Sequence, residues 1–154
     1  IISAPPQLTY SVAKQDVTGC NGDINGSITI TASGGTGTLY YSINGGINWF
    51  LTNTFTNLSA NSYEVRVRDD NNCTKGETVI ISQPAVIAIT NESYTQITCN
   101  NANNGTITIT ATGGTAPLTY TITGGGSNQT GVLPDYLQEP IRLQLTMPMV
   151  VHLQ

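Results

Sequence analysis

The sequence has few charges and no long apolar run. Charged side chains make up 9% of the 154 residues, the net charge is -4, and no basic patch is present that could follow a phosphate backbone. No stretch of about 18 apolar residues, the length that crosses a bilayer, occurs anywhere in the chain. We therefore expect neither a nucleic-acid partner nor a membrane-spanning segment.

The residues that catalysis and zinc binding require are also scarce. The only histidine, His152, has no nucleophile with which it would form a catalytic pair, and we interpret it as incidental. Cys20, Cys73 and Cys99 do not have the clustered spacing of zinc ligands. We predict no catalytic residue, no cofactor and no enzymatic activity.

The chain does not open with the basic and apolar regions of a signal peptide. Residues 1–5 instead read Ile-Ile-Ser-Ala-Pro, which matches Ile-Ile-Ser-Gln-Pro at residues 80–84. We therefore expect the chain to begin inside a larger protein, with residues 1–5 as the end of a preceding repeat.

The most informative feature of the sequence is an internal repeat with a period of 79 residues, the separation of Cys20 and Cys99. Cys20 to Gly46 reads CNGDINGSITITASGGTGTLYYSINGG, and Cys99 to Gly125 reads CNNANNGTITITATGGTAPLTYTITGG. The repeat predicts a complete module at residues 6–84 and a partial second module at residues 85–132.

Apolar residues alternate with polar ones inside each repeat, and this period of two is typical of β-strands. The residues expected to face the core are Ile28, Ile30, Ala32, Leu39, Tyr41, Ile43, Tyr63, Val65, Val67, Val79 and Ile81. Half a dozen short strands in about 80 residues fit an immunoglobulin-like sandwich. The fold class predicted is all-β, with tandem immunoglobulin-like β-sandwich repeats of which the second is incomplete.

Two cysteines of the complete repeat, Cys20 and Cys73, are candidates for a disulfide. A small sandwich has a marginal core, and closing a loop of this size would stabilise it by roughly 4 kcal/mol in the chain-entropy model. An extracellular location permits such a bridge. The alternative is two separate thiols, because the sequence does not show whether their Cα atoms approach.

The last segment, residues 133–154, does not resemble the first repeat. Back-translation with one T inserted after the codon of Val132 gives VFTGLSAGTYTITVNDANGCTST, which restores the pattern of NTFTNLSANSYEVRVRDDNNCTKG. We hypothesise that a one-nucleotide deletion shifted the reading frame of this tail. The alternative is a divergent closing segment or a genuine C-terminal extension.

The ordered motifs G-[ST]-I-T-I-T-A-[ST]-G-G-T, Leu-x-Tyr-[ST]-Ile and Tyr63-x-Val-x-Val-x-Asp69, followed by Asn72-Cys73-Thr74, resemble the SprB-type repeat. That family builds long gliding-motility adhesins and related surface proteins of Bacteroidetes. The resemblance covers almost all of residues 1–132 and implies a secreted or outer-cell-surface location, with export by the type IX system. It implies a spacer or adhesive role and supplies no catalytic residue.

Two sets of residues are candidate binding sites. Asp69, Asp70 and Asn71, with Asn72 beside them, place oxygen ligands in one loop that could hold calcium, with Asp23 and Asn25 as further ligands if the fold brings the loops together. The other interpretation is a polar turn, because Asp and Asn tolerate left-handed backbone conformations.

The second set contains the aromatic residues Tyr40, Trp49 and Phe50, which could stack on a sugar ring. The other interpretation is that they pack in the core or at a strand edge. The function predicted first is a spacer and multivalent adhesive module, with neighbouring repeats and surface glycans as partners. The alternative is a carbohydrate-binding module of a secreted polysaccharide-degrading enzyme.

Overall fold

The computed structural model describes residues 4–96, 98–99, 104–122, 127–128, 130–136 and 143–146. Every regular element in these residues is a β-strand, so none of them forms a helix that could cross a membrane. The chain forms two compact units, the first containing residues 1–18 and 22–83 and the second residues 19–21 and 84–154. The all-β fold predicted from the alternation is confirmed.

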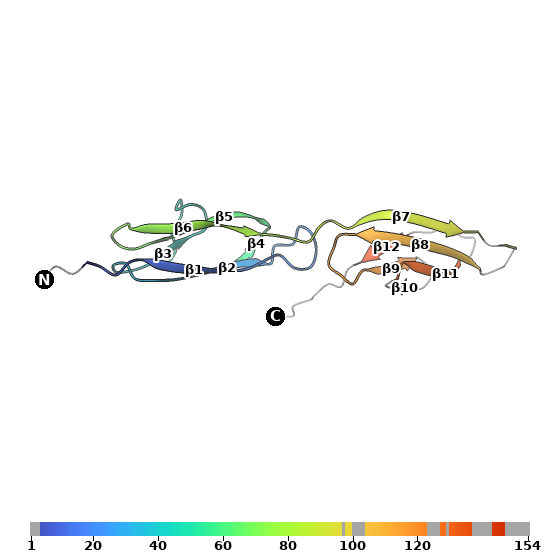
Figure 1. The fold of residues 1–154 in the computed structure, drawn as a ribbon, viewed down its shortest axis with the longest axis horizontal. Helices are drawn as coiled ribbons and strands as arrows, with labels where there is room; N and C mark the ends of the chain where they lie inside the picture. The colour runs from blue at the N-terminus through green and yellow to red at the C-terminus, as the bar shows by residue number, and fades with distance from the viewer. Residues whose placement is uncertain are drawn as a thin grey trace. The chain divides into compact units, whose positions relative to one another are not determined.

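The first unit is a sandwich of two three-stranded antiparallel sheets (Figure 1). One sheet has the order β1-β2-β4 and the other β3-β5-β6. The strands are β1 (Thr9–Gln15), β2 (Gly26–Ser33), β3 (Tyr40–Ser42), β4 (Thr54–Leu58), β5 (Asn61–Arg68) and β6 (Thr74–Ile81). This is the A-B-E and C-F-G strand order of an immunoglobulin-like sandwich, without strand D.

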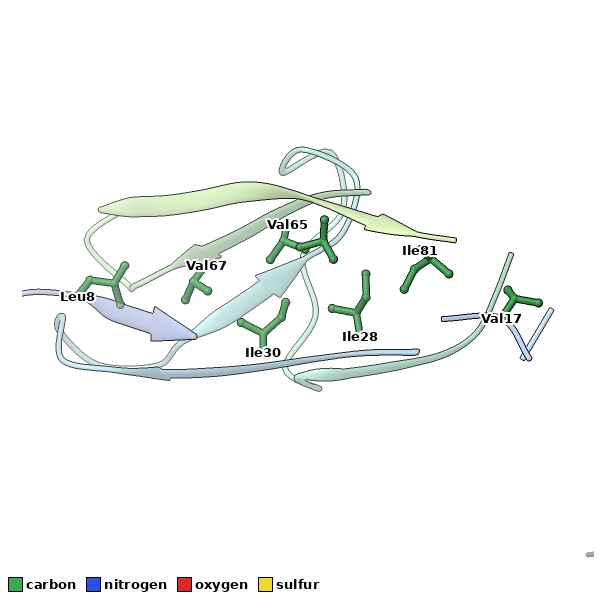
Figure 2. Packing of buried hydrophobic residues seen from close by; sticks show 8 residues of the cluster. Leu8, Val17, Ile28, Ile30, Val65, Val67 and Ile81 are labelled. Carbon is green, nitrogen blue, oxygen red and sulfur yellow. The ribbon is translucent and has the colours of Figure 1, made fainter. Parts of the chain in front are cut away.

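The core between the two sheets runs along the whole length of the strands (Figure 2). Leu8 lies at one end of it, and Ile81 and Val17 lie at the other. We call these the Leu8 end and the Ile81 end of the repeat. The predicted inward positions of β2, β5 and β6 are confirmed, with exposed fractions of 0% for Ile28, Ile30, Val65 and Val67, 9% for Val79 and 1% for Ile81.

A tyrosine at the start of β5 fixes the turn between β4 and β5. The hydroxyl of Tyr63 donates a hydrogen bond of 2.9 Å to the carbonyl oxygen of Ser59, four residues earlier. This is the tyrosine corner, which immunoglobulin-like sandwiches carry at the start of strand F. The corner therefore supports the same fold as the strand order does.

A glycine turn follows β2 at the Leu8 end. Gly34 has a φ of 80°, and a side chain there would collide with the carbonyl oxygen of Gln7. The NH of Gly35 donates a 2.8 Å hydrogen bond to the carbonyl of Pro6. In the second unit Gly113 also has a φ of 80°, and Gly114 donates in the same way to Ala85. The two repeats therefore build this turn alike.

The second unit has one sheet with the order β11-β8-β7 and another with the order β10-β9-β12. Its strands are β7 (Ala88–Thr95), β8 (Gly105–Thr112), β9 (Thr119–Ile122), β10 (Ser127–Asn128), β11 (Val132–Tyr136) and β12 (Leu143–Thr146). Ile109, Tyr120 and Leu133 form its buried core. The NH of Ile109 donates to the carbonyl of Gly131 as Ile30 donates to Asn53 in the first unit.

Two strands include residues of the dissimilar tail. β11 pairs with β8 and buries Leu133, and β12 pairs with β9 as β5 pairs with β3. Across the parts of the tail that the structure describes, residues 133–136 and 143–146, no counterpart of β6 occurs. His152 and the predicted Ile-Ile-Ser segment at residues 1–3 lie outside the described residues.

Candidate functional site

The aromatic candidates Tyr40 and Trp49 lie around one arginine on the outer face of the sheet that contains β3 and β5. Tyr40 is the register partner of Arg68, and the guanidinium carbon of Arg68 lies 5.2 Å from the centroid of the Tyr40 ring. The same carbon lies 4.6 Å from the centroid of Trp49. All three side chains are half-buried. Cation–π contacts of this kind stabilise a protein by about 0.5–1 kcal/mol at exposed sites.

Phe50, the third aromatic candidate, does not join this cluster. It forms an antiparallel bridge with Tyr41, whose side chain packs against the core, and its ring meets Phe55 edge-on at 5.7 Å. Neighbouring residues of an extended segment point to opposite faces, so Phe50 and Trp49 diverge. The structure therefore does not build one platform from Tyr40, Trp49 and Phe50, and Arg68 lies over the two rings that do come together.

The loop that carries Trp49 is held against the sheet by Ser42. The Oγ of Ser42 accepts hydrogen bonds from the backbone NH groups of Asn44 (3.3 Å) and Gly46 (3.0 Å) and donates to Oδ1 of Asn44 (2.9 Å). Ser42 is expected to face outward from its place in the alternation, yet its exposed fraction is 0% because this loop covers it. The loop is thus a fixed part of the fold.

The calcium candidates Asp69 and Asp70 use their carboxylates to hold backbone NH groups. Asp69 accepts from the NH of Thr36 at 2.9 Å and of Cys73 at 2.8 Å, and Asp70 accepts from the NH of Thr38 at 2.9 Å. The hydrogen bond from Thr36 is the largest cause that holds the pKa of the Asp69 carboxyl below its ordinary value of 3.8. Both carboxylates therefore anchor the glycine turn after β2.

The backbone of this segment has the geometry of the polar turn that the sequence offered as the other interpretation. Asn72 has a φ of 62°, a left-handed conformation that Asn tolerates, and Asn71 is exposed. In the parts of the chain that the structure describes, no group of three or more His, Cys, Asp or Glu side chains is placed to hold a metal. Calcium binding by Asp69, Asp70 and Asn71 stays a prediction.

The loop between β1 and β2 contains the other calcium candidates, Asp23 and Asn25. Asn25 is engaged with Thr18, from whose NH it accepts at 2.9 Å and to whose carbonyl it donates at 2.8 Å. This loop lies at the Ile81 end, where the NH of Val17 donates to the carbonyl of Ser82. The turn with Asp69 lies at the Leu8 end, so the fold does not join the two sets of ligands.

The same separation applies to Cys20 and Cys73. Cys20 belongs to the loop at the Ile81 end, whereas Cys73 lies in the turn between β5 and β6 at the Leu8 end. β1 connects the two ends, and its seven residues span about 24 Å. A disulfide needs Cα atoms within about 7 Å, and Cys73 is an exposed thiol in the structure. The predicted bridge within one repeat is not formed in this structure, because the directions of the strands place the loop with Cys20 and the turn with Cys73 at opposite ends.

One clamp at the Ile81 end was not found by sequence reasoning. Asp16 accepts hydrogen bonds of 2.8 Å from the ammonium group of Lys14 and from the NH of Ser82. The bond from Lys14 and then the bond from Ser82 lower the pKa of Asp16 from 3.8 to about 2. Lys14 also donates to the carbonyl of Ile80. A single Lys-x-Asp pair carries no signal in the sequence that would distinguish it from a solvated surface.

The model of the SprB repeat family matches the chain twice, at residues 11–48 and 91–127. No curated protein and no solved structure matches the chain. The first match begins in β1 and ends in the loop after β3, and it includes the glycine turn that the two repeats share. SprB repeats are modules of adhesin-like surface proteins and are a non-catalytic repeat type. The resemblance stated from the motifs is confirmed, because the model of the SprB repeat family matches two stretches of the chain, one in each repeat.

Proposed function

We propose that this chain is part of a tandem array that acts as a spacer and a multivalent adhesive element on the outer cell surface. The proposal rests on the direction of the chain through the first repeat. The chain enters the repeat at the Leu8 end, and its last strand, β6, ends with Ile81 at the opposite end (Figure 2). A module whose two termini lie at opposite ends adds its own length each time it is repeated.

Hydrogen bonds between side chains and backbone support the spacer role at both ends of the module. At the Leu8 end Asp69 and Asp70 hold the glycine turn, and at the Ile81 end Asp16 and Asn25 hold the loop between β1 and β2. The end loops are therefore fixed by hydrogen bonds to backbone NH groups. A pulling force along the array would be transmitted to the sheets through these fixed loops.

Multivalent adhesion follows from repetition. If each repeat offers one weak contact, linking copies raises the effective concentration of the next contact, and avidity grows without any new contact. Surface glycans are the partners proposed for these contacts, with export by the type IX system and a role in gliding motility as part of the same proposal. The alternative of an enzyme-linked carbohydrate-binding module gains no support from Tyr40 and Trp49, since Arg68 lies over both rings.

The test uses arrays of this chain with increasing numbers of copies of residues 6–84. Spacer function predicts that the maximum dimension measured by small-angle X-ray scattering rises linearly with copy number, by at least about 27 Å per copy, the span of an eight-residue strand. Adhesion predicts that beads coated with longer arrays stay on a glycan-bearing surface under flow that removes beads with the shortest array. A dimension that grows only as the cube root of mass, or retention independent of copy number, would contradict the proposal.

A further inference from the structure

Two arginines on the outer face of β5 carry positive charges that no carboxylate of the first repeat pairs with. Arg66 and Arg68 are two residues apart in one strand, so both point to the outer face, with their Cα atoms about 7 Å apart. Neither guanidinium group forms a hydrogen bond or an ion pair with a residue that the structure describes. Both groups can therefore accept an anion from outside the chain.

Arg68 is held in place by aromatic rings instead of by hydrogen bonds. Its guanidinium carbon lies 5.2 Å from the centroid of the Tyr40 ring and 4.6 Å from the centroid of Trp49. Among the described residues, Nε of Arg68 is the one side-chain nitrogen or oxygen that is buried without a hydrogen-bond partner. The two Nη groups of Arg68 also lack a partner there, so they are not buried. The rings therefore orient the guanidinium group while its outer nitrogen atoms reach solvent.

Two glycines make room for Arg66 beside the loop that carries Trp49. Gly76 is the register partner of Arg66 in β6, and a Cβ atom there would lie 2.9 Å from Cγ of Arg66. A Cβ atom on Gly46, in the loop after β3, would lie 2.9 Å from Cζ2 of Trp49 and 3.7 Å from Cδ of Arg66. The stem of the exposed Arg66 side chain therefore lies next to Trp49. We call the following four residues the arginine site: Tyr40, Trp49, Arg66 and Arg68.

The carboxylates of β5 and of the turn after it have other hydrogen-bond partners. Glu64, on the same face of β5 as the arginines, accepts a 2.6 Å hydrogen bond from the hydroxyl of Thr78. In the turn, Asp69 and Asp70 accept from backbone NH groups. A carboxylate or sulfate group of a ligand fits the two guanidinium groups, because a planar guanidinium forms two parallel hydrogen bonds to such an anion.

We propose that the arginine site binds an acidic polysaccharide through its carboxylate or sulfate groups. The inference rests on the proposed function, whose glycan partner it narrows to a charged one. Arg68 covers a face of both rings, so recognition is carried by the guanidinium groups and not by a sugar stacked on those faces. A nucleic acid fits less well, because two arginines in a chain of net charge -4 do not follow a phosphate backbone.

The arginine site belongs to the first repeat and is not part of the framework that the two repeats share. At the corresponding positions of the second repeat, the 79-residue period places Thr119, Asn128, Leu145 and Met147. None of these side chains carries a charge. The array tested below therefore contains copies of residues 6–84, each with its own arginine site.

The test measures binding of the full chain by surface plasmon resonance to polygalacturonate, which carries carboxylates, to dextran sulfate, which carries sulfates, and to neutral dextran. The variants are Arg66→Gln and Arg68→Gln. The matched control is Lys75→Gln, which removes the same charge from β6; Lys75 is the register partner of the buried Val67 and so belongs to the opposite face of the sheet. Circular dichroism checks that each variant is folded, and the exposed Arg66 can be replaced without disturbing the core.

We expect the chain to bind at least one of the charged polysaccharides and not neutral dextran, and the polysaccharide that it binds identifies the anion. Arg66→Gln and Arg68→Gln should each weaken this binding about tenfold, the effect of losing a charge-assisted hydrogen bond. Lys75→Gln should stay within about twofold, because an exposed charge outside the site is screened by salt.

Equal losses for Lys75→Gln and the arginine variants would overturn the proposal, because they would show attraction to net charge alone. Binding that both arginine variants retain, no binding to either charged polysaccharide, or equally tight binding to double-stranded DNA would overturn it as well. The proposed function is tested separately, by the length of arrays of residues 6–84 and by their retention under flow on neutral glycans. Arrays that lengthen linearly and stay on a neutral glycan, while the arginine variants bind as the parent chain does, would contradict this inference alone.

Discussion

Side chains of β6 point alternately into the core and out to solvent, so we predict different losses of stability when its two neighbouring isoleucines are truncated. Ile81 has an exposed fraction of 1%, whereas Ile80 has one of 61% and lies on the outer face. The changes are Ile81→Ala and Ile80→Ala, which remove the same atoms from the same strand. Because only one of the two side chains is surrounded by the core, only Ile81→Ala leaves a cavity in it.

The magnitudes follow from burial. Truncating a buried Ile to Ala typically costs about 2–5 kcal/mol, and an exposed substitution stays within about 0.5 kcal/mol. A domain of this size has a free energy of unfolding of about 4–12 kcal/mol, so a loss of about 3 kcal/mol removes much of its stability. The expected fall in melting temperature is about 12–24 °C for Ile81→Ala and a few degrees at most for Ile80→Ala.

The assay is urea unfolding of the full chain, followed by the emission of Trp49. Trp49 is the only tryptophan, so the signal reports the unfolding of the first repeat. Equal losses for Ile80→Ala and Ile81→Ala would refute the reasoning, because a slip of one residue in register exchanges the buried and exposed faces of a strand. A larger loss for Ile80→Ala would refute it as well.

Three further predictions concern the turns and the clamp of the first repeat. Gly34→Ala is expected to lower the melting temperature more than Gly22→Ala. Both glycines have a positive φ, but a side chain at Gly34 collides with the backbone whereas one at Gly22 meets open space. Equal losses would contradict the collision at Gly34. Tyr63→Phe is expected to lower the free energy of unfolding in urea by about 1 kcal/mol, the net contribution of one hydrogen bond. An unchanged midpoint would show that the tyrosine corner does not stabilise the repeat. The pKa of Asp16 is lowered from 3.8 to about 2, so its carboxylate contributes stability fully above about pH 4 and loses that contribution as the pH falls through about 2. Asp16→Asn should therefore lower the urea midpoint at neutral pH and make it less sensitive to acid between pH 4 and pH 2, and parallel acid profiles of the two proteins would count against the clamp.

The positions of the core residues could be predicted because they depend on a local rule. In β2 and β5 a period of two assigns Ile28, Ile30, Val65 and Val67 to one face, and all four are buried. β1 was not predicted, because Lys14 and Gln15 at its end are exposed and its alternation is weak. The burial of Ser42 was also missed, since it depends on a loop folding back over the outer face.

The candidate sites were predicted less well, because they depend on which segments the fold brings together in space. Trp49 and Phe50 are neighbours in the sequence but point to opposite faces, and Arg68, which brings Tyr40 and Trp49 together, is distant in the sequence. For Cys20 and Cys73 the deciding fact is the end of the sandwich at which each loop lies. The direction in which each strand runs determines this, and alternation carries no information on strand direction.

The low charge of the chain explains how its end loops are held. Among the residues that the structure describes, the one ion pair joins Lys14 and Asp16, and both side chains are about 40% exposed, so ion pairing adds little to stability. The loops are held instead by side-chain oxygens that accept from backbone NH groups, as Asp69 does from Thr36 and Asn25 does from Thr18. Such bonds are short-range and depend weakly on salt, unlike pairs of exposed charges. We therefore expect the end loops to stay ordered across changes in ionic strength, which would suit the spacer role that we propose.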